Sequence, residues 1–285
     1  MKQVAIISGK GGTGKTTVTA SFAALADTKV LADCDVDAAN LYLLLHPEGE
    51  TSEEFHGARV AVRDARLCAR CGECERLCRF GAITVDAVSE TNCEGCGLCV
   101  LACPQGALSL QPVVNSVVFR GQTRYGPMVY ARLKPAAENT GCLVTRVRQE
   151  AEDIAMRDGL SLILIDGPPG IGCTVTGSLT DTDLAVVVTE PSLSGMHDME
   201  RVVDLADRLR VPVATVINKA DINPANSATI TRYCADRGIP ILAELPFDEV
   251  VVAANAAQVP LVEYDDGPVS QGIRQAWKGI VALLA

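Results

Sequence analysis

The sequence predicts an α/β fold with a mostly parallel sheet and helices on both faces, into which a small α+β unit is inserted. Apolar stretches such as "LSLILID", "LAVVVTE" and "VATVIN" alternate with amphipathic stretches such as "MHDMERVVDLADRLR", an order typical of parallel sheets. A glycine-rich loop joins the first apolar stretch to a helix-forming one. Two cysteine-rich motifs interrupt the alternation between residues 57 and 110. We therefore expect one domain over residues 1–56 and 111–285, and an inserted domain over 57–110.

Composition limits where the protein works and what it binds. Its 285 residues are 48% hydrophobic, which is enough for a large core. A formal net charge of -10 with no Lys/Arg-rich run argues against nucleic acid as a partner. The apolar stretch at residues 4–7 is too short for a signal peptide or a membrane span. Eight of the twelve cysteines lie in the two motifs, a metal-ligand pattern that predicts a cytoplasmic protein.

The glycine-rich loop carries the first candidate site. "QVAIIS" is a short strand-like run that leads into "GKGGTGKTT", which matches G-x-x-x-x-G-K-[ST] over residues 9–16. Its glycines let backbone N–H groups surround phosphate oxygens, and the following helix adds its positive end. We expect Lys15 to reach the β- and γ-phosphates, and Thr16 to bind Mg²⁺. The predicted nucleotide-contacting residues of the loop are Gly9, Lys10, Gly11, Gly12, Thr13, Gly14, Lys15, Thr16 and Thr17.

A second lysine inside the loop, Lys10, makes the chain resemble the deviant Walker A family of P-loop ATPases, which includes MinD, ParA, nitrogenase iron protein and the Mrp/Nbp35 proteins. The resemblance covers nearly the whole chain outside the cysteine-bearing block. It implies an ATP-binding dimer in which Lys10 crosses to the nucleotide of the other subunit. The alternative is a solvated loop lysine with no such role.

Two further stretches support the resemblance. "VLADCDVDAANL" resembles the first switch of that family, which implies that Asp35, next to Asp33, positions the attacking water and binds Mg²⁺. "LILIDGPPG" ends a buried strand in Asp166, which corresponds to the Walker B acid, and Gly170 is free to turn in the second switch. The resemblance implies slow or partner-stimulated ATP hydrolysis by positioning and charge stabilisation. The implied catalytic residues are Lys10, Lys15, Asp35 and Asp166.

The resemblance also implies how the base is bound. Asn218, in "VATVINKAD", corresponds to an asparagine that reads the adenine edge in family members. "LPFD" resembles the loop that closes over the base, with Pro246 and Asp248 as its contact residues.

The two cysteine motifs, "CARCGECERLC" and "CEGCGLCVLAC", superpose at a shift of 25 residues and indicate an internal duplication. Each has the spacing C-x₂-C-x₂-C-x₃-C of bacterial ferredoxins, in which the fourth cysteine ligates the other cluster. We therefore expect two [4Fe-4S] clusters, with zinc as the competing interpretation. The expected ligands are Cys68, Cys71, Cys74 and Cys103 for cluster one, and Cys93, Cys96, Cys99 and Cys78 for cluster two.

Four cysteines remain. Cys173 follows the second switch and Cys142 follows a glycine before a predicted helix, and both positions resemble cluster ligands of nitrogenase iron protein. That resemblance implies an additional [4Fe-4S] cluster shared across a dimer. The alternative is that both are small buried apolar residues, as we expect for Cys34 and Cys234.

Together these features predict an ATPase whose nucleotide state controls electron transfer through two [4Fe-4S] clusters. One alternative is a cluster or metal carrier, although the C-x-x-C motif of the Mrp/Nbp35 carriers is missing. Another is a MinD-like positioning ATPase with redox-sensing clusters, but the C-terminal helix has only Arg274 and Lys278 for a cationic face, so we expect it to pack on the core. The expected partners are a second copy or a related ATPase, and a redox or cluster-accepting protein.

Overall fold

A computed structural model describes residues 1–135, 137 and 141–285 and divides the chain into two compact units. The first unit comprises residues 1–52, 118–132 and 139–285, and the second comprises 53–117 and 133–138. The predicted insert at 57–110 lies inside the second unit, which is longer at both ends. The boundaries after residues 52, 117 and 132 fall within the strands β3, β6 and β7, so no loop marks these three points.

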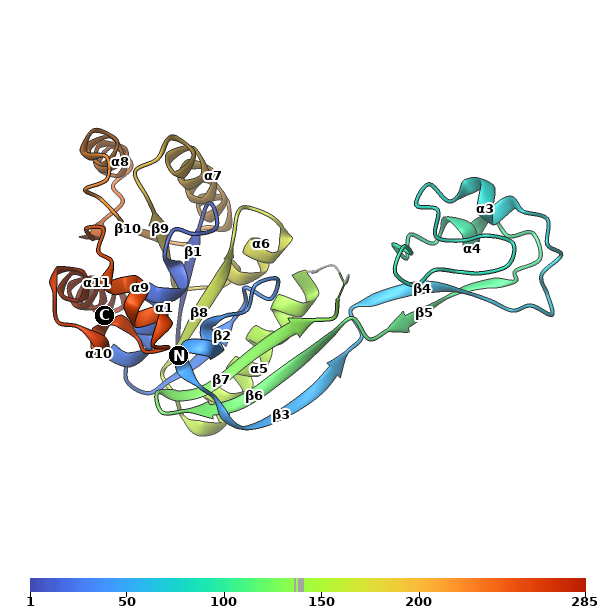
Figure 1. Ribbon diagram of the computed structural model, residues 1–285, viewed down its shortest axis with the longest axis horizontal. Coiled ribbons are helices and arrows are strands. Elements are labelled where there is room, and N and C mark those ends of the chain that lie inside the picture. The colour runs from blue at the N-terminus through green and yellow to red at the C-terminus, as the bar shows by residue number, and fades with distance from the viewer. Residues whose placement is uncertain (136, 138–140) are drawn as a thin grey trace. The chain divides into compact units, whose positions relative to one another are not determined.

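The first unit is built on a twisted sheet (Figure 1). In the part of the chain that the structure describes, its strand order is β11-β10-β9-β1-β8-β2-β7-β6-β3. The pairs from β11 to β7 that share a register are all parallel, as predicted. The strands are β1 (Lys2–Ser8), β2 (Lys29–Asp33), β3 (Glu48–Phe55), β6 (Ser116–Thr123), β7 (Gly126–Leu133), β8 (Leu162–Pro169), β9 (Leu184–Thr189), β10 (Val213–Ile217) and β11 (Ile241–Glu244).

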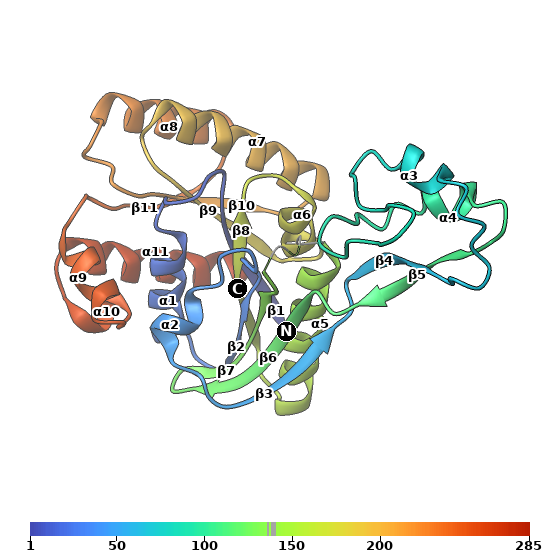
Figure 2. The same ribbon diagram turned by 45° about the vertical axis from the view of Figure 1, so that its right-hand side comes forward.

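Helices cover both faces of this sheet (Figures 1 and 2). On one face α5 packs on β2 and β8, α6 on β8, and α7 on β9; on the other, α1 packs on β8 and α11 on β11. The helices of the first unit are α1 (Lys15–Leu25), α2 (Leu41–Leu45), α5 (Gly141–Asp158), α6 (Cys173–Leu179), α7 (Leu193–Leu209), α8 (Pro224–Asp236), α9 (Val250–Ala256), α10 (Leu261–Tyr264) and α11 (Pro268–Leu284). This confirms the predicted α/β class.

The central strands are apolar along their whole length because both of their faces are covered. Every residue of β9 is buried, and in β1 only Lys2 is exposed. Val4 and Ile6 of β1 join one core cluster with Phe22 of α1, while the residues between them face the opposite layer. The buried sheet holds the carboxyl ends of β1, β2 and β8 side by side, which is where ligands bind in such folds.

β6 and β7 are neighbours in the sheet and are joined by the two residues Arg124 and Tyr125. The ring of Tyr130 in β7 stacks on Tyr42 of α2 at 5.1 Å and on Phe119 of β6 at 5.0 Å, measured between ring centroids. These contacts tie α2, which follows the first switch sequence, to the edge of the sheet.

The second unit combines a two-stranded antiparallel sheet with two short helices. The strands are β4 (Ala58–Arg63) and β5 (Leu108–Val113), and the helices are α3 (Glu73–Leu77) and α4 (Leu98–Ala102). The two helices contact each other, and α4 also contacts β5. Its small apolar core consists of Val60, Ala61, Ala82, Ile83, Ala107 and Leu108. So few buried side chains give a domain little stability unless a disulfide, a metal or a similar cross-link adds to it.

The sequence duplication in this unit is matched by a backbone duplication. Gly72 and Gly97 precede α3 and α4 with φ values of 76° and 77°, a left-handed conformation that glycine adopts without strain. The N–H of Gly81 donates to the carbonyl of Cys78 at 3.2 Å, and the N–H of Gly106 donates to that of Cys103 at 3.1 Å. Each cysteine motif therefore folds into the same loop, helix and turn.

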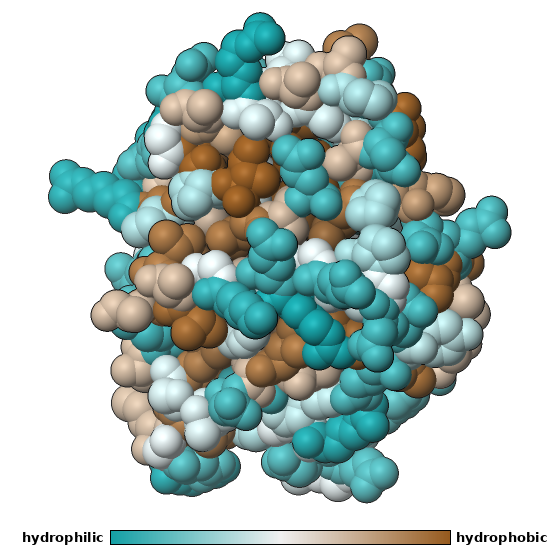
Figure 3. Space-filling model, turned by 90° about the vertical axis from the view of Figure 1, so that its left-hand side faces the viewer, coloured by the Kyte–Doolittle hydropathy of each residue, from teal (hydrophilic) through white to brown (hydrophobic). Residues whose placement is uncertain are grey.

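The C-terminal helix α11 packs on the core, as predicted. Ile273 and Ile280 are buried, and the Trp277 ring lies 5.5 Å from that of Phe22. Val281 of the same helix is 51% exposed. Figure 3 shows that hydrophilic residues interrupt the apolar ones on this side of the molecule. None of the helices described is both long enough and apolar enough to cross a bilayer.

Candidate functional site

The glycine-rich loop connects β1 to α1 at the carboxyl end of the sheet. Gly12 and Gly14 have φ values of 81° and 90°, which favour glycine. Gly14 is also fixed by packing, because a Cβ atom there would lie 2.4 Å from Nδ2 of Asn218. The loop thereby directs its backbone N–H groups into the site, followed by the N-terminus of α1, as phosphate binding requires.

The side chains predicted to serve the nucleotide site meet beside this loop. Nζ of Lys15 lies 3.1 Å from Oδ1 of Asp166 and 3.2 Å from Oδ2 of Asp35. The Thr16 hydroxyl donates to Oδ2 of Asp166 at 2.8 Å. The structure therefore brings together the residues predicted to bind phosphate and Mg²⁺ and to position water. Thr19, which sequence reasoning missed, also donates to Asp166, at 2.8 Å.

The carboxylates of this cluster differ in their surroundings. Asp33 is fully buried, and it accepts hydrogen bonds from the N–H of Asp35 and of Leu41, each at 3.1 Å. Burial, and then the nearby Asp166, raise the pKa of Asp33 well above its usual range. Burial likewise raises the pKa of Asp35. Asp33 therefore shapes the first switch loop, whereas Asp35 faces the site.

A cavity of about 450 Å³ opens beside these residues, a size suited to a small-molecule ligand. Its lining joins the loop to both switch sequences. It is lined by Ser8, Gly11, Gly12, Thr13, Gly14, Lys15, Thr16, Thr17, Asp35, Asp37, Ala38, Asn40, Pro168, Pro169 and Thr174. The N–H of Gly170, whose φ is 95°, donates to the carbonyl of Ser8 at 2.9 Å and connects the second switch to β1.

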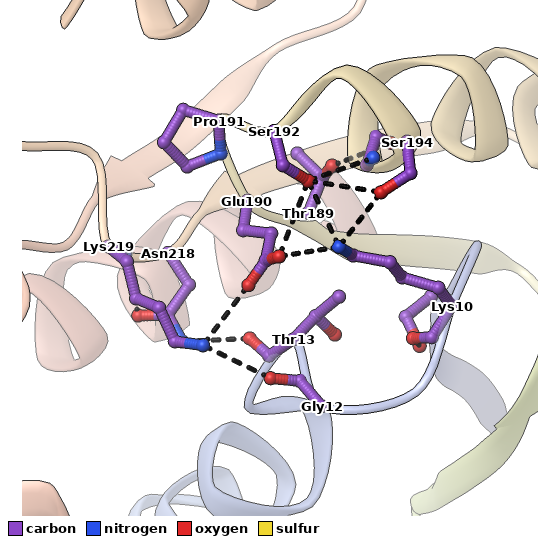
Figure 4. Close-up of polar contacts among 12 residues, drawn as sticks. Lys10, Gly12, Thr13, Thr189, Glu190, Pro191, Ser192, Ser194, Asn218 and Lys219 are labelled. Carbon is purple, nitrogen blue, oxygen red and sulfur yellow. Dashed lines mark hydrogen bonds and ion pairs between the residues drawn. The ribbon is translucent and has the colours of Figure 1, made fainter. Parts of the chain in front are cut away.

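Lys10 points away from this cavity, toward the corner between β9 and α7 (Figure 4). Its Nζ lies 2.6 Å from Oε1 of Glu190 and donates to the hydroxyls of Ser192 at 3.0 Å and Ser194 at 3.1 Å. Sequence reasoning missed Glu190, although its position directly after the apolar stretch "LAVVVT" was a usable signal.

The residues predicted to bind the base have other partners. Nδ2 of Asn218 donates to the carbonyl of Thr13 at 2.8 Å, and its Oδ1 accepts the N–H of Lys219 at 3.0 Å. Oδ1 of Asp248 accepts the N–H of Val250 at 2.9 Å, at the start of α9. Asn218 thus braces the glycine-rich loop, and Pro246 and Asp248 lie outside the lining of the cavity described above.

In the second unit the eight motif cysteines line two separate cavities. Each cavity takes three cysteines from one motif and the fourth from the other, which is the grouping that the crossed ferredoxin pattern predicts. One cavity is lined by Cys68, Cys71, Cys74 and Cys103, and the other by Cys93, Cys96, Cys99 and Cys78. All eight thiols are free and none is fully buried.

Hydrogen-bond donors surround these sulfur atoms. Backbone N–H groups donate to Sγ of Cys93 and of Cys78 at 3.4 Å, and to Sγ of Cys103 at 3.3 Å. Arg63 also lines the first cavity; its Nη2 lies 4.0 Å from Sγ of Cys74, and its buried Nε has no hydrogen-bond partner. Among the described residues no three His, Cys, Asp or Glu side chains converge on a point that a single metal ion could fill.

The remaining cysteines divide as the sequence suggested. Cys34 and Cys234 are fully buried, and burial raises the pKa of both thiols. Cys142 and Cys173 are exposed, so they are not buried apolar residues. Cys173 begins α6, and a Cβ atom at Gly141, the first residue of α5, would lie 3.2 Å from the carbonyl oxygen of Cys173. The two exposed cysteines therefore lie at the contacting starts of neighbouring helices.

β8 continues to Pro169, past Asp166, where we expected the strand to end. The parallel sheet, the glycine-rich loop with its lysine, and the acid Asp166 within β8 define a P-loop nucleotide-binding protein. The chain matches the CobQ/CobB/MinD/ParA nucleotide binding domain over residues 4–261 and belongs to that family of P-loop ATPases.

Relatives and solved structures agree with this assignment. The chain is 31% identical over 280 residues to an uncharacterized protein of Methanocaldococcus jannaschii, covering 97% of this chain and 95% of that protein. It is 24% identical over 299 residues to the iron-sulfur cluster carrier protein of Pyrococcus furiosus, covering 98% and 85%. Its fold is similar to that of the septum site-determining protein MinD of Pyrococcus horikoshii, solved with Mg-ADP, with a TM-score of 0.60 and 19% identity over 100% and 97% of the two chains.

Proposed function

We propose that this ATPase is a nucleotide-switched iron-sulfur protein, in which the ATP state of a dimer controls electron transfer through two [4Fe-4S] clusters in the second unit. The observation that carries the proposal is the sorting of eight cysteines into two cavities of four. Such a sorting is unexpected for a unit in which the cysteines only pack.

The donor set fits two cubanes. Zinc held by thiolates draws its sulfur ligands to within about 4 Å of one another, and the described residues contain no such group. A cubane spreads four thiolates over four iron corners, so its ligands stand farther apart. N–H groups directed at Sγ of Cys78, Cys93 and Cys103 stabilise thiolate charge, as around bound clusters. When bound, the clusters would supply one-electron transfer at low potential.

The first unit supplies the nucleotide response. Lys15 and Thr16 would exchange their contacts with Asp166 for phosphate and Mg²⁺, and Asp35 would orient the attacking water. Asp35 is linked through Asp33 to the start of α2, because the Asp33 carboxylate accepts the N–H groups of both Asp35 and Leu41. A change at the phosphate site would therefore alter the first switch loop and α2.

The test is to purify the protein anaerobically, count iron and sulfide, reduce the clusters with dithionite and remove its excess, and then follow electron transfer from the protein to a one-electron acceptor with ATP, ADP or no nucleotide. We expect roughly eight irons per chain and a rate that depends on the nucleotide. In the unaltered protein the electron-transfer rate should change as ATP in the mixture is hydrolysed to ADP. An Asp35→Asn variant should bind ATP but hydrolyse it too slowly, so its rate should stay constant while the mixture ages. Equal rates in all nucleotide states would contradict the switch, and an iron count near zero would contradict the clusters.

A carrier function is the second candidate, because the chain is similar over nearly its whole length to proteins named iron-sulfur cluster carriers. The crossed grouping argues against a carrier function. Releasing one cluster would free three cysteines of one motif and one of the other, and would therefore open both loops. Mixing the loaded protein with an apo-ferredoxin separates the two functions. Cluster transfer that requires Lys15 would favour the carrier, and retention of iron with continued electron transfer would favour our proposal.

The exposed pair Cys142 and Cys173 supports a further proposal, a [4Fe-4S] cluster shared by two copies. Their helices begin in contact, so each copy would present two thiols at one place. Iron counting decides it: a shared cluster would raise the count from roughly eight to about ten per chain. Cys142→Ser should then remove only the extra iron. A count unaffected by this substitution would show that the pair holds no cluster.

A further inference from the structure

One carboxylate, that of Glu190, holds two lysines at the nucleotide site (Figure 4). Its Oε1 lies 2.6 Å from Nζ of Lys10, and its Oε2 lies 3.1 Å from Nζ of Lys219. We infer that Glu190 is a positioning residue that keeps Lys10 bound to its own chain until nucleotide-dependent dimer formation releases it. The inference rests on the proposed function for the dimer, and goes beyond it by naming the contact that dimer formation must break.

The contacts of Lys10 leave its ammonium group no free donor. A lysine ammonium has three N–H donors. The three acceptors here are the carboxylate of Glu190 and the hydroxyls of Ser192 and Ser194, all within the corner that joins β9 to α7. Gly9 packs against the same helix, since a Cβ atom there would lie 2.5 Å from Asp198. Lys10 can reach phosphates on another chain only if its own contacts break.

The strength of this contact comes from charge in a partly closed environment. The side chains of Lys10, Glu190 and Lys219 are 28%, 18% and 29% exposed, so water screens the pairs only in part. Burial alone would raise the pKa of Glu190, but Lys10 and Lys219 outweigh it and lower that pKa, so the carboxylate is ionised at neutral pH. Hydrogen bonds to charged groups contribute more than neutral ones.

The second lysine gives Glu190 a separate link to the glycine-rich loop. Nζ of Lys219 also donates to the carbonyl of Gly12 at 3.2 Å. Removing the Glu190 charge therefore weakens two interactions: the pair with Lys10, which restrains that lysine, and the pair with Lys219, which supports the loop. A test has to separate these two interactions, because only the pair with Lys10 concerns dimer formation.

The test compares Glu190→Gln with the unaltered, cluster-loaded full chain by sedimentation velocity in a non-hydrolysable ATP analogue. We expect the protein concentration at which half the chains are dimeric to fall about tenfold or more, because the resting contact is lost. Glu200→Gln is the matched control: it removes the same charge from an exposed position on α7 and should leave that midpoint unchanged. An unchanged or higher midpoint in Glu190→Gln would overturn the inference.

Lys219→Met distinguishes restraint of Lys10 from support of the loop, because it keeps the contact between Lys10 and Glu190 and breaks the link to Gly12. We expect weaker nucleotide binding and, at saturating nucleotide, an unchanged dimer midpoint. If this variant lowers the midpoint as Glu190→Gln does, restraint of Lys10 is not the cause. Should Glu190→Gln fail to fold, Ser194→Ala removes one acceptor from Lys10 and should lower the midpoint severalfold.

A second readout does not need a dimer. The rate at which an acylating reagent modifies Lys10 in the nucleotide-free protein, followed by peptide mass spectrometry, should rise severalfold in Glu190→Gln and stay constant in Glu200→Gln. If the unaltered chain is monomeric in every nucleotide state, the proposed dimer switch is wrong. The labelling rate would still test whether Glu190 restrains Lys10. Equal labelling in both variants would show that Glu190 does not restrain Lys10.

Discussion

Nζ of Lys15 lies 3.1 Å from Oδ1 of Asp166, so the lysine of the glycine-rich loop is bound by an acid within β8. Burial alone would lower the pKa of Lys15, but Asp166, Asp35 and Asp33 outweigh it and raise that pKa. The lysine is therefore charged and is the main counter-ion for three buried carboxylates. Phosphates have to compete for it, and Mg²⁺ would compensate the carboxylates that lose it.

Replacing Lys15 with Met should destabilise the protein even without nucleotide. We expect the free energy of unfolding to fall by about 3 kcal/mol, because buried carboxylates lose their cation. Denaturant unfolding followed by fluorescence of Trp277, the one tryptophan of the chain, measures it. Lys2→Met is the control: Lys2 pairs with Asp183 but is half exposed, so its loss should cost less than about 1 kcal/mol. Equal effects would show that Lys15 matters only to phosphate.

Asp35→Asn should slow ATP hydrolysis by about a hundredfold or more while nucleotide binding persists. Asp35 and the neighbouring Asp37 both line the cavity, and Oδ2 of Asp35 lies 3.2 Å from Nζ of Lys15. Asp37→Asn is the matched variant, with an expected change of less than about threefold. Steady-state rates and ADP affinity separate the two effects. A large loss of ADP affinity in Asp35→Asn would assign that residue to binding rather than hydrolysis.

Cys78→Ser should remove the cluster held by the other motif. The structure places Cys78 in the cavity of Cys93, Cys96 and Cys99, so roughly four of eight irons should be lost from that cavity. Cys103→Ser should remove the cluster in the first cavity instead. Electron paramagnetic resonance of the reduced variants should show two different surviving signals. If each variant loses the cluster of its own motif, the ligand sets do not cross.

Arg63→Met should lower the reduction potential of the cluster in the first cavity. The guanidinium lies 4.0 Å from Sγ of Cys74 and donates to the carbonyl of Val85 at 2.7 Å, so its positive charge would stabilise an electron added to a cluster bound there. We expect a shift on the order of tens of millivolts. The shift should survive in Cys78→Ser and vanish in Cys103→Ser. Arg66→Met, which removes an exposed arginine, is the control; an equal shift there would exclude a specific effect.

The sequence predicted which side chains meet at the candidate nucleotide site, because short motifs contain them. The loop with Lys15, the strand that carries Asp166 and the spacing of the cysteines each depend on neighbouring residues, so a local pattern was sufficient. The crossed grouping of Cys78 and Cys103 follows the same logic, since a short helix fixes how far each fourth cysteine lies from the other three.

Contacts between distant segments were the part that could not be predicted. Glu190 and Lys219 are single charged residues at strand ends, and no local pattern shows that both bind around the glycine-rich loop. The hydrogen bond from the amide of Asn218 to the carbonyl of Thr13 likewise joins residues 205 positions apart, and no local pattern indicates it. Strands that continue through a boundary between the two units leave no change in composition to mark it.

Cys78 and Cys103 each lie in the cavity of the other motif, and this limits how the module can be shortened. Neither repeat of the duplicated module can complete a four-cysteine cavity alone, because each repeat places three cysteines in one cavity and its fourth in the other. Shortening the module to a single repeat would leave a triplet of thiols beside an orphaned fourth. A single-repeat version would therefore need a new fourth cysteine beside its own three.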